Sequence, residues 1–445
     1  MNMARITANA LGDLRGFGRS RIRREVEINA RRAPQEITAM QEVLFGKRVL
    51  DAVNRFPMYA DKVRAHCGAV PTCAAEIRPG MLPIWTKKDQ RELFASLREP
   101  PLPGAFIHAT GGSTGEPTRF YMTRESNEWR VAVADRGYAW AGAEEGVRSL
   151  YIWSTPVHPP SAAKALKQRL ARWLANRKQF SLFQFSMERK RECCATLNAF
   201  RPKALVSYSG NLLELACFVR DNPGLLQWHP ATIVGAAEGL PPGGREIVEK
   251  YLGGSVSMSY GTREFMLIGM ECRHHEGYHI SADNLFVEVV DEEGRQAKPG
   301  QTGRILVTDL RNPATPFIRY EVGDMGAMMD NSPCGCGCPF PRLARVEGRC
   351  GEYVELPDGS RLTAIFIAHT LKEFLWIDGF QIFQPDRYGI TVRLVTRDPL
   401  DPGKLAILEH TMRDKMGKTL RIDFARVSEL EKAASGKTLP VIRVS

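Results

Sequence analysis

The sequence predicts an α/β protein with a large first domain and a smaller α+β domain at its C-terminus. From residue 204 onward, short apolar runs such as ALVSYS, TIVGAA and SVSMSYG alternate with segments of helical pattern. This alternation is typical of a largely parallel sheet. After Gly348 the pattern changes to short strands in pairs. We therefore expect residues 1–348 to form the large domain and residues 349–445 to form the small one.

The large domain is expected to begin with helices. Residues 1–65 have helical spacing, and many of the first 32 residues are basic, which predicts a helical basic arm on the surface. Thr86, with Asp89 three residues later, has the pattern of a helix N-cap. A helix over residues 126–141 and a strand over residues 150–154 follow.

The segment over residues 162–178 predicts an amphipathic basic helix. Leu166, Leu170, Trp173 and Leu174 fall on one face of this helix. We expect this face to pack on the core, with contact to a membrane surface as the alternative.

The small domain is expected to contain two hairpins and two helices. VELPDGSRLT reads as a hairpin with its turn at residues 358–359, and FQIFQPDRYGITVRLVT reads as a second hairpin. Helices are predicted at about residues 364–375 and 402–416, and LRIDFARV is predicted to be a last strand.

Composition limits the classes of function. The 445 residues carry a net charge of +11, which favours anionic ligands such as nucleotides, pyrophosphate, coenzyme A or nucleic acid. No apolar run reaches the ~18 residues of a membrane span, and no secretory signal is visible, so we expect no stable membrane insertion. Ten cysteines are too few for a disulfide scaffold of this length, and a cytoplasmic protein is expected.

Four polar segments carry the chemistry. The Gly-rich loop TGGSTGEPT at residues 110–118 could cradle a phosphate, although it lacks the Lys-Ser/Thr ending of a P-loop. SYGTRE at residues 259–264 follows an apolar run and offers an aromatic ring and a carboxylate. RYEVGD at residues 319–324 could place an aspartate against ribose hydroxyls, and ASGK at residues 434–437 places a lysine in a loop of small residues.

The order and spacing of these segments resemble the phenylacetate–CoA ligase branch of the adenylate-forming superfamily, including its capsular-polysaccharide-type group. The resemblance covers roughly residues 45–445 and includes HATGGSTGEPTRF, TIVGAAEGLPPG, SYGTREFMLIGMEC, PFIRYEVGDMG and CGCGCPFPRLARVEGR. It implies a large ATP- and acid-binding domain of the adenylate-forming type and a small, mobile domain that carries a catalytic lysine.

The resemblance also implies roles for single residues. Lys437 matches the catalytic lysine, Glu264 the acid associated with Mg²⁺, and Thr262 the contact to the α-phosphate. The other positions that match the nucleotide- and acyl-binding segments and the domain hinge are Gly112, Ser113, Thr114, Gly115, Ala237, Glu238, Ser259, Tyr260, Gly261, Asp324 and Arg349.

The implied activity is ATP-dependent conversion of a carboxylic acid, aryl or arylacetic by resemblance, to an acyl-adenylate. Transfer to a thiol follows, with coenzyme A as the leading acceptor. Two alternatives stay open: an adenylyltransferase that loads a carrier-protein thiol or an amine, and a non-catalytic homologue. Glu116 stands where many relatives have lysine, Cys350 and Gly351 replace the hinge acids, and the RGVNVFP-like stretch of the thiol tunnel is absent.

A metal site is predicted from Cys272, His279, Cys334 and Cys336. Zinc favours four Cys and His ligands, and glycines between cysteines allow a tight knuckle. Relatives with a similar pattern look like zinc binders with this ligand set, so a structural Zn²⁺ is implied. His274, His275 and Cys338 are alternative ligands, and free thiols are the alternative interpretation. The cluster lacks a paired CxxC ribbon and no aromatic–basic RNA motif accompanies it, so no nucleic-acid partner is expected.

Overall fold

The computed structural model describes most of the chain. The described residues are 13, 18–110, 118–153, 162–181, 187–237, 239–240, 243–330, 332–349, 353–357, 361–363, 367, 371, 374, 376–377, 379–396, 398–416, 420–431 and 441–443. The chain divides into a large unit, made mainly of residues up to Val346, and a small unit made mainly of Glu347–Ser445.

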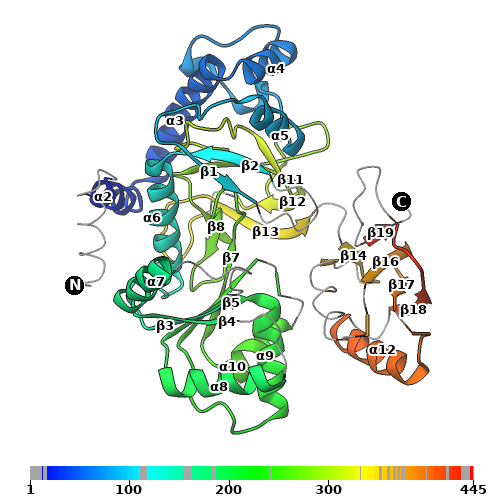
Figure 1. Ribbon diagram of the computed structural model, residues 1–445. Helices are drawn as coiled ribbons and strands as arrows, with labels where there is room; N and C mark the ends of the chain where they lie inside the picture. The colour runs from blue at the N-terminus through cyan, green and yellow to red at the C-terminus, as the bar shows by residue number, and fades with distance from the viewer. Residues whose placement is uncertain are drawn as a thin grey trace. The chain divides into compact units, whose positions relative to one another are not determined.

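The large unit is built on an eleven-stranded sheet with the order β10-β11-β12-β13-β9-β8-β7-β6-β5-β3-β4 (Figure 1). Its strands are β3 (Ser149–Trp153), β4 (Arg177–Ser181), β5 (Ala204–Tyr208), β6 (Thr232–Ala236), β7 (Ser255–Tyr260), β8 (Gly269–Glu271), β9 (Tyr278–Ile280), β10 (Leu285–Val290), β11 (Gly303–Asp309), β12 (Tyr320–Met328) and β13 (Arg342–Arg349).

The sheet is mixed rather than largely parallel. Strands β4, β3, β5, β6 and β7 pair in parallel, whereas the pairs β7–β8, β8–β9, β9–β13 and β10–β11 are antiparallel. Helical crossovers separate the first group, as parallel pairing requires. From β7 onward, turns too short for a crossover join β7 to β8 and β8 to β9.

The helices of the large unit cover this sheet and the N-terminal region. They are α2 (Arg19–Asn29), α3 (Pro34–Arg55), α4 (Pro57–Cys67), α5 (Lys87–Ser96), α6 (Arg124–Trp140), α7 (Ala162–Leu174), α8 (Met187–Phe200), α9 (Ser209–Asp221) and α10 (Gly244–Leu252), with short 3₁₀ turns at Ala74–Glu76 and Pro79–Met81. Thr86 caps α5 as predicted, because its hydroxyl accepts from the Asp89 amide at 3.2 Å.

The first described helix packs on the body instead of extending from it. Ile22 and Val26 of α2 are buried against Trp129 and Val133 of α6. Arg23 of α2 pairs with Asp135 at 2.6 Å, and Arg19 pairs with Glu128 at 2.7 Å. Much of the positive charge of α2 is therefore matched within the protein.

A short hairpin holds the two ends of the Gly-rich segment. β1 (Phe106–Ala109) pairs with β2 (Arg119–Met122) in antiparallel register. Next to this pair, the Thr110 amide donates to the Thr118 carbonyl at 3.0 Å, and the Thr118 amide donates to Thr110 Oγ1 at 2.9 Å. The residues between, 111–117, lie outside the described part.

The small unit contains both predicted hairpins. β14 (Tyr353–Glu355) pairs with β15 (Arg361–Thr363), and β16 (Gly379–Asp386) pairs with β17 (Gly389–Val395). β18 (Arg421–Arg426) and β19 (Val441–Arg443) complete a four-stranded sheet in the order β18-β17-β16-β19, and α12 (Pro402–Met416) is the second predicted helix. The helix predicted at residues 364–375 falls largely outside the described residues.

The expectation for the helix at residues 162–178 was wrong in two respects. The helix ends at Leu174, and Arg177 already belongs to β4. In addition, Leu166, Leu170 and Trp173 are exposed at 69%, 55% and 74% instead of packing on the core. α7 meets β4 through Arg172, whose guanidinium donates to Gln179 at 2.8 Å.

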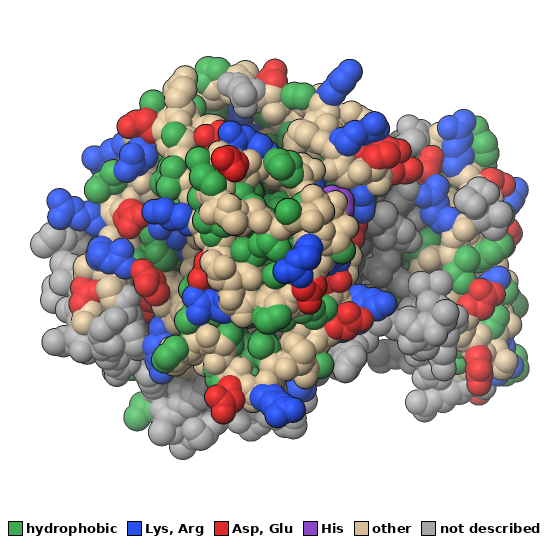
Figure 2. All heavy atoms as spheres, turned by 90° about the horizontal axis from the view of Figure 1, so that it is seen from above, with side chains coloured by type: hydrophobic (Ala, Val, Ile, Leu, Met, Phe, Trp, Pro, Cys, Tyr) green, Lys and Arg blue, Asp and Glu red, His purple; other side chains and the backbone are tan. Residues whose placement is uncertain are grey.

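Among the described helices, none combines the length and the apolar character that crossing a bilayer requires. On the face drawn in Figure 2, Lys and Arg side chains lie interspersed with Asp and Glu.

Candidate active site and metal centre

The carboxyl ends of β6 and β7 lie side by side and bring two predicted segments together. Gly235 of β6 pairs with Met258 of β7, and the Ser259 hydroxyl donates to the Gly235 carbonyl at 3.0 Å. Ala237, just past β6, has a positive φ of 73°, a strained value for a residue with a Cβ. Ligands of open α/β sheets bind at such strand ends.

A tight turn joins β7 to β8. The Met266 amide donates to the Thr262 carbonyl at 2.7 Å, and the Ile268 amide donates to the Tyr260 carbonyl at 2.9 Å. At Gly261 a Cβ would stand 1.8 Å from the Met266 carbonyl oxygen, so only glycine allows this close approach. The turn thereby fixes the positions of Thr262 and Glu264.

Thr262 and Glu264 are held differently. The Glu264 carboxylate is buried and accepts from the Tyr320 hydroxyl at 3.2 Å. Burial, together with this carboxylate, raises the pKa of Tyr320, so the phenol stays a donor. Thr262 Oγ1 is also buried but has no hydrogen-bond partner among the residues that the structure describes. Buried polar atoms are nearly always satisfied, so such an atom has capacity for a ligand or a water.

Arg130 and His108 join this group, although no role was predicted for either from the sequence. Arg130 of α6 donates to the Arg263 carbonyl at 2.8 Å, while its Nε is buried without a partner in the described part of the chain. Burial lowers the pKa of Arg130 to about 10, and Glu264 lies near enough to oppose this shift. His108 stacks on Phe120, and its Nδ1 is likewise buried without a partner. Burial and the charge of Arg130 lower its pKa, which favours the neutral imidazole.

For the other residues predicted to bind the nucleotide, the structure gives only their positions in the fold, or does not describe them. Asp324 lies in β12, and Arg349 is the last residue of β13. Tyr260 closes β7 and is buried. Gly112, Ser113, Thr114, Gly115, Glu238 and Lys437 lie outside the described residues.

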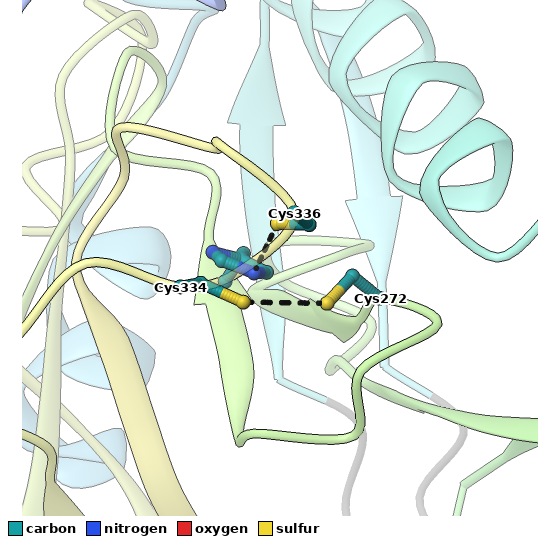
Figure 3. A group of neighbouring side chains, drawn as sticks. Cys272, Cys334 and Cys336 are labelled. Carbon is teal, nitrogen blue, oxygen red and sulfur yellow. Dashed lines mark hydrogen bonds between the residues drawn. The ribbon is translucent and has the colours of Figure 1, made fainter.

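The four predicted metal ligands meet at one point of the large unit. Cys272 directly follows β8, and His279 lies in the paired strand β9. Cys334 and Cys336 lie on the loop between β12 and β13, and β13 pairs with β9. Figure 3 shows Cys334 facing Cys272 from the opposite loop, while the Cys336 sulfur on the same loop is directed at the imidazole of His279. Cys272 and Cys334, which are 62 positions apart in the sequence, are thus neighbours in the fold.

The geometry of the cluster fits a tetrahedral cation. One ligand atom from each residue lies within 4.8 Å of all the others. The Cys272 and Cys334 sulfurs are 3.6 Å apart, and Cys336 Sγ is 3.3 Å from His279 Nε2. Zn–S bonds of about 2.3 Å place tetrahedral ligands about 3.8 Å apart. The distances are therefore those of ligands around a zinc-sized ion.

Backbone amides support the two cysteine segments. The His274 amide points at Cys272 Sγ and the Cys338 amide at Cys336 Sγ, both at 3.4 Å. The Gly337 amide donates to the Cys334 carbonyl at 3.0 Å, and Gly337 has a positive φ of 74°. This tight turn is the knuckle that the CGCGC spacing predicted, and its amides are oriented to stabilise thiolates.

The protonation states of the four side chains are also compatible with metal binding. Burial lowers the pKa of His279 to about 4, so its imidazole is neutral and can offer a lone pair. Desolvation raises the pKa of Cys336 to about 12 and raises that of Cys272. A bound cation reverses this preference and holds thiols as thiolates. The Trp140 and His279 rings pack at an interplanar angle of 62° with centroids 5.5 Å apart, which limits the orientation of the imidazole.

Comparison with known proteins identifies relatives of this chain. Residues 354–444 match the family model described as CapK C-terminal domain. The chain is 26% identical to phenylacetate-coenzyme A ligase of Thermus thermophilus, over 72% of each protein. It is 23% identical to Protein CapK of Staphylococcus aureus, over 74% of this chain and 72% of that protein.

The fold is shared with a solved ligase. The structure of 2-hydroxyisobutyryl-CoA ligase in its postadenylation state superposes with a TM-score of 0.62 at 18% identity, covering 94% of this chain and 91% of that chain. The chain therefore has the fold of the adenylate-forming superfamily. Within it, the chain is a homologue of the phenylacetate-CoA ligases and of Protein CapK, and it carries a CapK C-terminal domain.

Proposed function

We propose that this chain is an AMP-forming acid–thiol ligase. A carboxylate oxygen of the substrate attacks the α-phosphorus of ATP and pyrophosphate leaves. A thiol then attacks the acyl carbon of the adenylate and AMP leaves. Coenzyme A is the proposed thiol, because the relatives that cover 72% of the chain are phenylacetate-coenzyme A ligases by name. An aryl or arylacetic acid is the proposed substrate class on the same ground.

One observation carries the proposal: the turn between β7 and β8 presents Thr262 and Glu264 at the carboxyl end of a parallel strand. The buried, unpartnered Thr262 hydroxyl has a hydrogen bond to give to a phosphoryl oxygen. The Glu264 carboxylate, held by Tyr320, is an oxygen ligand of the kind that Mg²⁺ takes. Magnesium bound there would neutralise charge on the phosphates. Preorganised donors of this kind stabilise the charge that develops in the transition state.

Residues predicted by resemblance complete the proposed site. Gly112, Ser113, Thr114 and Gly115 are proposed to bind the outer phosphates, and Asp324 the ribose. Ala237, Glu238, Ser259, Tyr260 and Gly261 are proposed to line the adenine and acyl pockets. Arg349 is proposed as the hinge between domains 1–348 and 349–445, and Lys437 as the catalytic lysine. The hydrogen bonds at Thr110 and Thr118 support the first of these roles, since they fix both ends of the phosphate loop.

The test is pyrophosphate release with ATP and Mg²⁺ across a panel of aromatic and aliphatic acids, with and without coenzyme A. Acid-dependent release that is lost in Lys437→Ala supports adenylation. An acyl-CoA product supports the proposed acceptor. An acyl-adenylate that hydroxylamine traps, but that coenzyme A does not consume, would instead favour a carrier-protein thiol or an amine. A protein that binds ATP but releases no pyrophosphate with any acid contradicts the proposal for this substrate class.

Cys272, His279, Cys334 and Cys336 are proposed to bind one structural Zn²⁺. Four protein ligands close the coordination sphere and leave no position for a substrate. The expected result is about one zinc per chain by elemental analysis of protein purified without a histidine tag. A fully folded preparation that lacks metal would end this proposal.

A further inference from the structure

Helix α7 (Ala162–Leu174) exposes the face that an amphipathic helix normally buries. The structure gives thirteen exposed large apolar side chains in its described part, and four of them belong to this one helix. Leu166, Leu170 and Trp173 are four and three residues apart, so they share one face, and Trp173 is 74% exposed.

Polar contacts, not this apolar face, attach α7 to the sheet. Arg172 donates to Gln179 of β4 at 2.8 Å. Past the helix end, the Asn176 side chain donates to the Gly146 carbonyl at 3.3 Å, and the Ser149 amide donates to the Asn176 carbonyl at 3.1 Å. Figure 1 shows α7 beside β3 and β4, at the outer end of the sheet, where β4 is the last strand. The attachment leaves Leu166, Leu170 and Trp173 directed to solvent.

The sequence that contains this helix carries charge of one sign. Between Glu145 and Glu188 the sequence has seven Lys and Arg residues and no Asp or Glu. Within the described part, Arg169 and Lys178 are exposed. On the face drawn in Figure 2, by contrast, acidic and basic side chains are interspersed. Exposed Leu and Trp side chains next to Lys and Arg are typical of helices that lie in the interfacial region of anionic bilayers.

We propose that α7 docks this protein on an anionic lipid surface, with Leu166, Leu170 and Trp173 inserted at the level of the headgroups and acyl chains. Tryptophan favours this boundary, and neighbouring Lys and Arg each contribute about 1 kcal/mol near an anionic surface. A second copy of the chain fits less well, because a two-fold contact places the same surface on both sides and would bring the two basic segments together.

The experiment uses the full chain and vesicles of phosphatidylglycerol and phosphatidylcholine, against vesicles of phosphatidylcholine alone. Binding is measured by co-sedimentation at low and high salt. The test variant is Leu170→Ser with Trp173→Ser, and the matched control is Ile407→Ser on α12, where Ile407 is 62% exposed. All three substituted side chains are exposed, so folding should be unchanged.

The expected result is binding to the anionic vesicles that salt weakens, with affinity at least about tenfold lower in the double variant and unchanged in Ile407→Ser. Equal affinity of the double variant and the wild-type protein would overturn the proposal, as would the absence of binding to anionic vesicles. A wild-type dimer on sizing that the double variant converts to a monomer, with no lipid binding, would assign the face to a second copy instead. Capture of an acidic protein partner without lipid binding would also overturn the proposal.

Discussion

The β7–β8 hairpin carries a polar group at each end, and the two groups differ in how their polar atoms are satisfied. After β8, Cys272 turns its sulfur toward Cys334 and the other ligands, all within 4.8 Å. At the turn, neither Thr262 Oγ1 nor the Nε of nearby Arg130 has a hydrogen-bond partner among the described residues. The first group can close around a small cation, whereas the second has capacity left for a larger ligand. The metal cluster would thus fix the base of the hairpin, and the turn would act on the substrate.

Among these variants, Glu264→Gln is expected to have the largest effect. It should lower the enzymatic activity and leave the stability of the fold unchanged. The amide has the shape of the carboxylate and its oxygen can still accept from Tyr320, so the fold should be kept. The negative charge proposed for Mg²⁺ is lost, and acid-dependent pyrophosphate release should fall by about 10²-fold or more. Tyr320→Phe, which removes the donor but leaves the charge, should lose much less. Comparable losses in both variants would indicate that the hydrogen bond, not the charge, is what matters.

Loss of a metal ligand is expected to act on stability. Cys334→Ala should abolish zinc retention and lower the Tm by about 10 °C, because metal binding to such sites contributes folding free energy. Elemental analysis and thermal unfolding provide the two measurements.

Cys338→Ala is the matched control, since Cys338 lies two residues from Cys336 but outside the four-ligand set. The Cys338→Ala variant should keep its zinc. A chelator should then lower the Tm of the wild-type protein and of this control, but not that of Cys334→Ala. Zinc loss in Cys338→Ala instead would make that thiol a ligand.

The meeting of the three cysteines and His279 was predictable from sequence because these residues carry local signals. The CGCGC spacing constrains the tight turn by itself, and Cys272 precedes His279 by only seven residues. Metal binding by this cluster stays a prediction. The β-hairpins of the small unit were predictable for the same reason, since alternation and a DG turn are properties of neighbouring residues. Lys437 and the phosphate loop remain predictions, because they lie outside the described residues.

Features that depend on distant packing were not predictable. Arg130 has the spacing of a charged residue on a helix surface, but in the fold it is buried, where it contacts Met122 of β2 and the Arg263 carbonyl. His108 is a single histidine with no periodic context, and only the fold brings it near Arg130. The apolar periodicity of residues 162–178 predicted an amphipathic helix correctly, but periodicity does not say whether the apolar face meets the core or the solvent.

Thr262→Val is expected to give the smallest effect, and it tests the unpartnered hydroxyl directly. Because Thr262 Oγ1 makes no hydrogen bond within the described part of the chain, its removal should leave the Tm unchanged or slightly higher. Pyrophosphate release should nevertheless fall by about tenfold. The matched control is Thr315→Val: Thr315 Oγ1 is also buried but accepts from the Tyr121 amide at 3.0 Å and donates to the Tyr121 carbonyl at 2.8 Å. That variant should lose about 1–3 kcal/mol of unfolding free energy with little change in kcat for the protein that stays folded. If Thr262→Val loses stability but not activity, its hydroxyl has a structural partner, and the contrast between the two ends of the hairpin does not hold.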